Sequence, residues 1–315
     1  MKTVIAPAEP SNFVETNYVK QISNRALSYI EAGLPVHFSG PAGVGKTSLA
    51  FHLASLIGRP IVLIHGDEEV KTSNFVGNDY GYRFKRNIDR FQSRVSKFEE
   101  SMVRQWVDNR LTTACKHGFT LIYDEFTRSR PEANNILLSI LSERILNLPV
   151  AGDQEESFVK VHPNFTAIFT SNQKEYAGVH PSQDALMDRL VTLTLDAFDY
   201  ETEVAVTQAK SGLSKLDAQA IVSLVRDLKS APSCDIGPSV RSCIKIAKIL
   251  KVQDMFPISA NKNFVHILED VLISESVRHG SEVNSGVLKK MVQELAQKYM
   301  TRTPVAKSSQ ERAGV

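Results

Sequence analysis

The sequence predicts an α/β fold with a parallel sheet between helices, followed by a smaller all-α domain. Between residues 17 and 195, short apolar runs alternate with amphipathic helical stretches. This alternation is typical of a parallel sheet that is covered on both faces. The first apolar run leads through a glycine-rich segment into a helical pattern. From Tyr200 onward only helical periodicity remains, which predicts a second domain made of helices.

The first elements surround the glycine-rich segment. Residues 17–32 carry apolar side chains at helical spacing, and residues 36–39 form a short apolar strand. Residues 47–57 have helical periodicity that stops at Gly58. The loop at residues 40–47 therefore joins the end of a buried strand to the start of a helix.

This loop reads Gly-Pro-Ala-Gly-Val-Gly-Lys-Thr, a full match to the phosphate-binding pattern G-x-x-x-x-G-K-[S/T]. Its glycines permit backbone angles that let successive N–H groups surround phosphate oxygens, and the helix adds its positive end. We expect Lys46 to reach the β- and γ-phosphates of ATP and the Thr47 hydroxyl to bind Mg²⁺. The context of strand and helix favours this over a glycine turn without a ligand. The predicted nucleotide-binding residues are Gly40, Pro41, Ala42, Gly43, Val44, Gly45, Lys46, Thr47 and Ser48.

The remaining elements of the first domain follow from further patterns. Apolar runs predict four more strands, at residues 61–64, 119–123, 165–170 and 190–195. Residues 66–81 are glycine-rich and predict an irregular connection. Helical patterns predict one long helix over residues 89–116 and another over 131–144. Residues 146–161 predict a hairpin that turns at Ala151-Gly152-Asp153.

Two acidic residues follow the predicted strand at residues 119–123. In an open α/β sheet, ligands lie at the carboxyl ends of the strands, so Asp124 and Glu125 are expected to face the phosphate loop. We expect Asp124 to hold Mg²⁺ and Glu125 to polarise the attacking water. Asn172 follows the next strand, where its amide can bind the γ-phosphate or that water. Alone, an Asp-Glu pair after a strand is more often a solvated strand end, and an Asn there is commonly a turn residue.

Two arginines complete the predicted catalytic set. Arg189 precedes a strand and is expected to reach the nucleotide of a neighbouring subunit, where an arginine stabilises transition-state charge. The alternative for Arg189 is a local pair with Asp184 or Asp188. Arg241 lies near the start of a helix in the second domain, where it can contact the γ-phosphate or stand exposed in solvent.

The order of these parts resembles the MoxR group of AAA+ ATPases. The similarity lies in residues 124–128, 131–135 and 137–144, and the predicted hairpin matches an insertion of that group. More narrowly, residues 40–47, 123–135 and 170–180 resemble the gas vesicle protein N family. The resemblance covers most of residues 15–280. The first motif is general to P-loop proteins, and the other two are more specific.

The resemblance implies a fold and a role. The fold is a P-loop AAA+ core followed by an all-α lid, with ATP and Mg²⁺ as ligands. The implied role is Mg²⁺-dependent ATP hydrolysis coupled to protein remodelling during gas vesicle assembly, by a cytoplasmic hexameric ring. Its partners would be gas vesicle shell or accessory proteins. The expected boundaries are a lead-in at 1–15, the ATPase domain at 16–199, the lid at 200–300 and a disordered tail at 301–315.

Composition excludes several classes of function. The net charge of +2 gives no general signal for nucleic acid, and the predicted hairpin is mainly acidic, which disfavours a nucleic-acid partner. No apolar stretch approaches the roughly 20 residues needed to cross a membrane, and the first ten residues do not resemble a signal peptide. Three cysteines without C-x-x-C spacing predict reduced thiols and no zinc site.

Other features are open to two interpretations. Arg86, Arg90 and Arg94 recur every four residues, which on a helix would form a basic stripe for an acidic partner or a solvated face. The glycine- and aromatic-rich segment at 66–81 is either a mobile loop that grips substrate or a plain connection. His37, inside a predicted strand, is expected to be buried and hydrogen-bonded.

Two alternatives to a remodelling motor remain. The first is a MoxR-type activator of another enzyme, with the same nucleotide site and a different partner. The second is an ATP-gated structural component of the vesicle, in which hydrolysis is incidental.

Overall fold

The computed structural model describes residues 4–69, 72–88, 98–148, 158–172, 184–230, 239–255, 262–278 and 285–300. The chain forms two compact units that meet in sequence between Leu195 and Asp196. The second unit also takes in Ser11–Gln21 and Ala42–Val44. Each unit has its own apolar core.

The first unit is built on a five-stranded parallel sheet with strand order β2-β5-β8-β1-β9. All five predicted strands are present: β1 (Val36–Gly40), β2 (Ile61–His65), β5 (Thr120–Asp124), β8 (Thr166–Asn172) and β9 (Val191–Thr194). The interior strand β5 is buried along its whole length, as expected for a strand covered on both faces.

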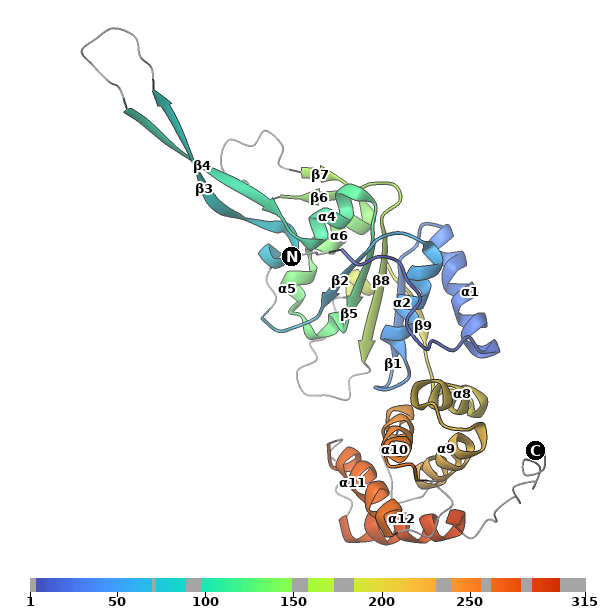
Figure 1. Cartoon of the computed structure of the whole chain (residues 1–315). Coiled ribbons are helices and arrows are strands. Elements are labelled where there is room, and N and C mark those ends of the chain that lie inside the picture. Colours follow the sequence, from blue (N-terminus) through green and yellow to red (C-terminus); the bar gives the residue numbers. More distant parts are fainter. Residues whose placement is uncertain are drawn as a thin grey trace, which may run out of the picture. The chain divides into compact units, whose positions relative to one another are not determined.

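Helices cover both faces of this sheet (Figure 1). On one side lie α1 (Asn17–Glu31) and α2 (Lys46–Ile57). On the other side lie α4 (Arg110–His117), α5 (Pro131–Asn134) and α6 (Ile136–Ser142). Shorter elements are α3 (Thr72–Val76), the 3-10 turn η1 (Phe126–Arg128) and α7 (Asp184–Met187). The predicted helix at 131–144 is thus two helices, which meet at Asn135.

The prediction of one long helix over residues 89–116 is wrong. Strands β3 (Gly77–Ile88) and β4 (Phe98–Asp108) pair antiparallel, and within the described residues 98–116 only α4 is helical. Figure 1 shows the β3–β4 ribbon extending away from the helices that cover the sheet. A spacing of four residues places side chains on one face of a helix and also on one face of a strand. The sequence pattern was therefore compatible with both structures.

The β3–β4 ribbon also affects two other predictions from the sequence. Arg86 belongs to β3, so the proposed helical stripe of arginines is wrong at that position, while Arg90 and Arg94 lie outside the described residues. The segment at 66–81 is not wholly irregular, because it contains α3 and the start of β3. The predicted hairpin is confirmed as β6 (Ile145–Asn147) paired with β7 (Phe158–Lys160), although its turn lies outside the described residues.

The second unit consists of helices in the part of the chain that the structure describes. They are α8 (Tyr200–Ser211), α9 (Lys215–Lys229), α10 (Val240–Val252), α11 (Lys262–Arg278) and α12 (Ser285–Met300). Asp199, Ser214 and Ser239 cap α8, α9 and α10 with their side-chain oxygens, as polar residues do at helix starts. The predicted change from strands to helices after residue 200 is confirmed. None of the described helices has the length and apolarity required to cross a bilayer.

Candidate active site

The polar residues predicted to act on a nucleotide lie at the carboxyl ends of neighbouring parallel strands. The register pairs Gly40 at the end of β1 with Asn172 at the end of β8. It also pairs His65 at the end of β2 with Asp124 at the end of β5. Parallel strands carry their carboxyl ends to the same edge of a sheet, which is where α/β proteins bind ligands.

The loop after β1 has the backbone of an anion cradle. Gly43 and Gly45 have φ values of +91° and +76°, which favour glycine because it has no Cβ. Gly45 also precedes the first turn of α2, so the positive end of that helix opens onto the loop. Lys46 is only 7% exposed, and its Nζ donates to the carbonyl oxygens of Gly40 at 2.9 Å and Pro41 at 2.6 Å.

Asp124 connects the loop to two strands. Its Oδ1 accepts hydrogen bonds from Thr47 Oγ1 at 2.7 Å and from Thr170 Oγ1 at 2.6 Å. Its Oδ2 lies 3.6 Å from His65 Nδ1. Asp124 is 7% exposed, so a charged carboxylate is held almost out of water by two hydroxyl donors. The structure thus brings together the hydroxyl and the carboxylate that the sequence predicts as Mg²⁺ ligands.

Glu125 follows Asp124 in an uncommon backbone conformation. Its φ is +53°, in the left-handed region, and its N–H donates to Thr170 Oγ1 at 2.9 Å. Its Oε1 accepts from Asn172 Nδ2 at 3.3 Å and its Oε2 accepts from Arg128 Nη1 at 2.9 Å. Residues held in this region outside glycine tend to occur at functional sites, where the surrounding contacts compensate for the strain.

His37 lies within the sheet, near the start of β1. Its Nδ1 is 3.0 Å from Thr192 Oγ1 and its Nε2 is 2.9 Å from Ser171 Oγ. The prediction of a buried, hydrogen-bonded histidine is confirmed, since only 1% of it is exposed. Burial, together with the positive charge of Lys46, lowers the pKa of His37 to about 4. The ring is therefore neutral at pH 7.

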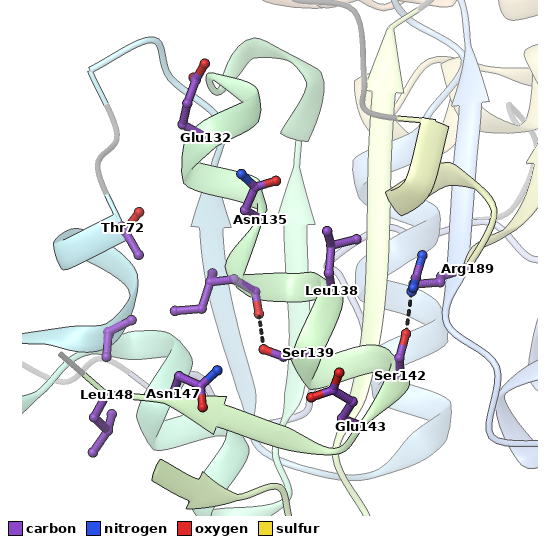
Figure 2. A pocket seen from close by; sticks show the side chains of 12 residues that line it. Thr72, Glu132, Asn135, Leu138, Ser139, Ser142, Glu143, Asn147, Leu148 and Arg189 are labelled. Atoms are coloured by element: carbon purple, nitrogen blue, oxygen red, sulfur yellow. Dashed lines mark hydrogen bonds between the residues drawn. The ribbon is translucent and has the colours of Figure 1, made fainter. Parts of the chain in front are cut away.

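Arg189 stands apart from these residues, at the rim of a cavity of about 740 Å³ (Figure 2). Its Nε donates to Ser142 Oγ and its Nη1 to the Ala185 carbonyl oxygen. Figure 2 shows the first of these bonds, which joins Arg189 to the end of α6. Asp184 and Asp188, the local partners that the sequence suggested, form no ion pair with it among the described residues, where Ser142 and Ala185 accept its hydrogen bonds.

Arg241 lies in the first turn of α10 in the second unit and is exposed. Its backbone N–H donates to the Ser239 side chain, which caps the helix. The contact of Arg241 with a nucleotide stays a prediction. The structure thus brings five predicted residues together at the carboxyl ends of neighbouring strands: Lys46, Thr47, Asp124, Glu125 and Asn172. Arg189 lies elsewhere on the first unit.

Sequence reasoning missed two members of this network. Thr170 bonds to both Asp124 and Glu125, yet a threonine in an apolar strand is an ordinary strand former. Arg128 pairs with Glu125, and the signal that could have identified it is its spacing of three residues within one turn.

The donor set fits a nucleotide with Mg²⁺. The cradle offers backbone N–H groups and an ammonium group to phosphate oxygens. Thr47 and Asp124 offer the oxygen ligands that Mg²⁺ prefers. When bound, Mg²⁺ would neutralise charge that develops on the phosphates.

A parallel sheet with this strand order, a phosphate loop after β1 and a helical second unit define a P-loop ATPase of the AAA+ class. Residues 35–190 match the family model of the AAA domain (dynein-related subfamily). The solved structure of NtrX from Brucella abortus in complex with ADP has a similar fold, with a TM-score of 0.50 and 15% identity. That similarity covers 91% of this chain and 64% of the NtrX chain.

Curated relatives specify the family further. The chain is 45% identical over 272 residues to the gas vesicle ATPase GvpN of Ancylobacter aquaticus, covering 86% of this chain and 76% of that protein. It is 42% identical over 276 residues to the gas vesicle ATPase GvpN of Haloferax mediterranei, covering 86% and 77%. The chain belongs to the gas vesicle ATPase GvpN family, and it is an ATP hydrolase of the AAA+ class.

Proposed function

We propose that the protein couples ATP binding and hydrolysis to remodelling of proteins during gas vesicle assembly. The observation that carries the proposal is the hydrogen-bonded set of Thr47, Asp124, Glu125 and Asn172 at the carboxyl edge of the sheet. The names of its relatives point to gas vesicles as the setting. Gas vesicle shell or accessory proteins are the partners that this function requires.

Within this proposal each residue has a role. Residues 40–48 hold the phosphates, with Lys46 contributing the charge that balances them. Thr47 and Asp124 hold Mg²⁺. Glu125 polarises the attacking water, and Asn172 orients Glu125 or the water through its amide. Thr170 fixes Asp124 and the Glu125 backbone by hydrogen bonds, so it acts through those two residues.

The arginines extend the proposal beyond one chain. Arg189 is exposed, and its hydrogen-bond partners, the Ser142 hydroxyl and the Ala185 carbonyl oxygen, are uncharged. Its positive charge is therefore free of a paired carboxylate in these bonds and can bind the phosphates of a nucleotide that another subunit holds. Such an arrangement needs a closed ring in which every subunit contributes one arginine, and we propose a hexamer. Arg241 would couple the nucleotide to the lid domain at residues 200–300, with the ATPase domain at residues 16–199.

The first experiment measures steady-state ATP hydrolysis with and without the small apolar gas vesicle shell protein. Lys46→Ala and Glu125→Gln serve as blanks. We expect the shell protein to raise the rate of the unmodified protein and to leave both blanks at background. A general base contributes roughly 10²- to 10⁴-fold to such a reaction. Equal rates with and without the shell protein would contradict a motor that acts on the shell.

A mixing experiment tests the role of Arg189. Neither Glu125→Gln nor Arg189→Ala subunits should hydrolyse ATP alone. In mixed rings, some sites combine an intact Glu125 with an intact Arg189 from the neighbour, so activity should return. If mixing restores nothing, Arg189 does not act on a neighbouring subunit's nucleotide.

The same Glu125→Gln variant distinguishes the remodelling proposal from the alternative of a structural component. If ATP binding alone is needed, cells that carry this variant should still form vesicles. Under the remodelling proposal they should not. Under the activator alternative, a different enzyme would stimulate ATP hydrolysis. Co-purification of partners with the Glu125→Gln variant would identify that enzyme.

A further inference from the structure

Three buried polar side chains join β5, the turn that follows it and α5. They belong to Tyr123, Ser129 and Asn134, which are 0%, 1% and 4% exposed. The Tyr123 Oη lies 2.7 Å from Ser129 Oγ and 2.9 Å from Asn134 Oδ1. The Asn134 Nδ2 donates to the Phe126 carbonyl at 3.4 Å. These three side chains are called the Tyr123 network below.

The hydrogens of this network can be placed by counting donors. A hydroxyl has a single hydrogen, and a carboxamide oxygen only accepts. The Asn134 amide cannot be turned over, because its oxygen would then face the carbonyl oxygen of Phe126. Tyr123 therefore gives its hydrogen to Asn134, and Ser129 gives its hydrogen to Tyr123. This leaves Ser129 Oγ to accept from the Asp67 N–H at 3.1 Å.

The result is one directed line of hydrogen bonds from the loop after β2 to the turn after β5. It begins at the Asp67 N–H and ends at the Phe126 carbonyl, with the Tyr123 network between them. Burial raises the pKa of Tyr123, so its hydroxyl keeps the hydrogen that the line requires. In a buried line the bonds polarise one another, and the loss of one member leaves its neighbours unpaired.

Both ends of this line adjoin Glu125. Phe126 follows Glu125 directly, and its carbonyl also accepts from the Ser129 N–H at 3.2 Å, which closes the turn. In the loop after β2, the Gly66 N–H donates to the Asp124 carbonyl at 2.7 Å. A Cβ added at Gly66 would lie 2.0 Å from the Glu125 carbonyl oxygen, closer than real contacts allow. The turn is therefore held between α5 and the loop after β2.

The backbone of Glu125 requires such support. Its φ of +53° lies in the left-handed region, which a residue with a Cβ adopts only at a cost in energy. Among the described residues, the bonds of the Tyr123 network reach the backbone of the turn rather than the Glu125 carboxylate. The network can therefore determine where the Glu125 side chain starts, without changing its charge.

We propose that Tyr123, Ser129 and Asn134 are positioning residues for hydrolysis, which hold the Glu125 backbone in the conformation that directs its carboxylate to the attacking water. The proposal rests on the role of Glu125 under the proposed function. Because the three residues act through Glu125, they should affect the rate of the chemical step. Nucleotide binding, which depends on residues 40–48, should stay almost unchanged.

The test compares kcat, KM and the affinity for a non-hydrolysable ATP analogue in variants of the full chain. Tyr123→Phe removes one oxygen and keeps the ring that contacts Phe75 and Phe169. We expect kcat to fall about tenfold, because a general base that is misplaced loses part of its roughly 10²- to 10⁴-fold contribution. KM and the analogue affinity should stay within about twofold.

The matched control is Tyr200→Phe in the second unit. The Tyr200 Oη lies 3.1 Å from Ser223 Oγ and donates to the Gln219 carbonyl at 3.5 Å, so this variant also removes one hydroxyl with two partners. It should leave kcat within about twofold. Thermal unfolding of each variant establishes that it is folded at the temperature of the assay. Ser129→Ala, which removes the hydrogen donated to Tyr123, should lower kcat in the same direction as Tyr123→Phe.

Two double variants test whether the network acts as one unit and through Glu125. Asn134→Leu has a similar shape and should lower kcat by about the same factor as Tyr123→Phe. Combining the two should lower kcat little further, because either change already interrupts the line. Adding Tyr123→Phe to Glu125→Gln should not slow the residual hydrolysis, since the base that the network positions is already absent.

The outcomes separate this proposal from the proposed function. If Tyr123→Phe keeps the normal kcat while Glu125→Gln is inactive, the network serves only the fold and Glu125 keeps its role. If Tyr200→Phe lowers kcat as much as Tyr123→Phe, the loss reflects stability and the positioning role is wrong. Losses that multiply in the variant with both Tyr123→Phe and Asn134→Leu would contradict a single line of bonds. If Glu125→Gln hydrolyses ATP at the normal rate, the role of Glu125 fails and the positioning proposal fails with it.

Discussion

The two units bury polar side chains in different ways. In the first unit some of these residues share one network at the carboxyl ends of the strands, where Asp124 bonds to Thr170 and to Thr47, while others, such as Ser23 and His52, lie elsewhere. In the second unit they are spread along the helices and paired locally. Asp217 bonds to the cap of its own helix, Glu203 to Arg226, and Glu269 to Lys289 and Gln293.

This difference separates polar groups that serve chemistry from those that serve structure. Burying a polar group without a hydrogen-bond partner is costly, so most such groups are paired. In the second unit the partners of Asp217, Glu203 and Glu269 are a helix cap or side chains of an adjacent helix, so these bonds stabilise the helices. In the first unit several donors and acceptors share one network at an edge where the fold binds ligands. Changes in the second unit should therefore alter stability, and changes at the edge should alter catalysis.

The largest expected effect is on the core of the second unit. Phe264 is 1% exposed and packs in the cluster that contains Ile246, Leu250 and Leu268. Phe264→Ala should destabilise the helices by about 4 kcal/mol through lost burial and a cavity. Hydrogen exchange of the amides in α9 and α10 measures this loss. Protection equal to that of the unmodified protein would show that this residue does not hold the helices together.

The next largest effect concerns the pH dependence of the first unit. The pKa of His37 falls from 6.5 unfolded to about 4 folded, so below pH 6.5 the unfolded chain binds a proton that the folded chain does not. The contribution of neutral His37 to the free energy of unfolding is fully present above pH 6.5. It declines as the pH falls toward 4, by about 3 kcal/mol in total. Urea unfolding at several pH values should show this decline, and the stability of His37→Gln should vary less with pH. Parallel pH curves for the two proteins would contradict it.

A smaller effect, but one on catalysis, is expected at Thr170. Thr170→Val keeps the shape of the side chain and removes its bonds to Asp124 and to the Glu125 N–H. We expect kcat to fall about tenfold, because both residues lose a fixed partner, while the fold persists. The matched control is Thr192→Val, which alters a partner of His37 away from Asp124 and should leave kcat nearly unchanged. A loss of folding without a specific loss of kcat would place Thr170 among the structural polar groups.

The smallest effect is the loss of a helix cap. Ser214 accepts from the Asp217 N–H at 3.2 Å and donates to the Asp217 carboxylate at 2.7 Å. Ser214→Ala should cost about 1 kcal/mol and leave hydrolysis unchanged. Thermal unfolding and the hydrolysis rate measure both parts of this prediction. Ser214→Asp, which retains a capping oxygen, should recover most of the lost stability.

The parts that could be predicted from sequence are those with a fixed local pattern. The phosphate loop is contiguous, and the polar residues at the ends of β5 and β8 follow apolar runs, so parallel pairing places them at one edge. The β3–β4 ribbon could not be predicted because a four-residue spacing fits helix and strand alike. The pairing of Arg128 with Glu125 has a three-residue spacing as its signal, but the left-handed φ of Glu125 before the 3-10 turn is not revealed by residue type.

The β3–β4 ribbon has the length of a lever arm. Its strands have 12 and 11 residues, so at about 3.3 Å per residue it reaches roughly 40 Å from its base. Its first strand continues directly from α3, and the base is tied to α4 where the Val76 carbonyl accepts bonds from Asn109 and Thr112. Over such an arm, a rotation of about 10° at the base becomes a displacement of roughly 7 Å at the far end. A small rotation at α3 and α4 would thereby become, at the far end of the ribbon, a displacement as large as a side chain.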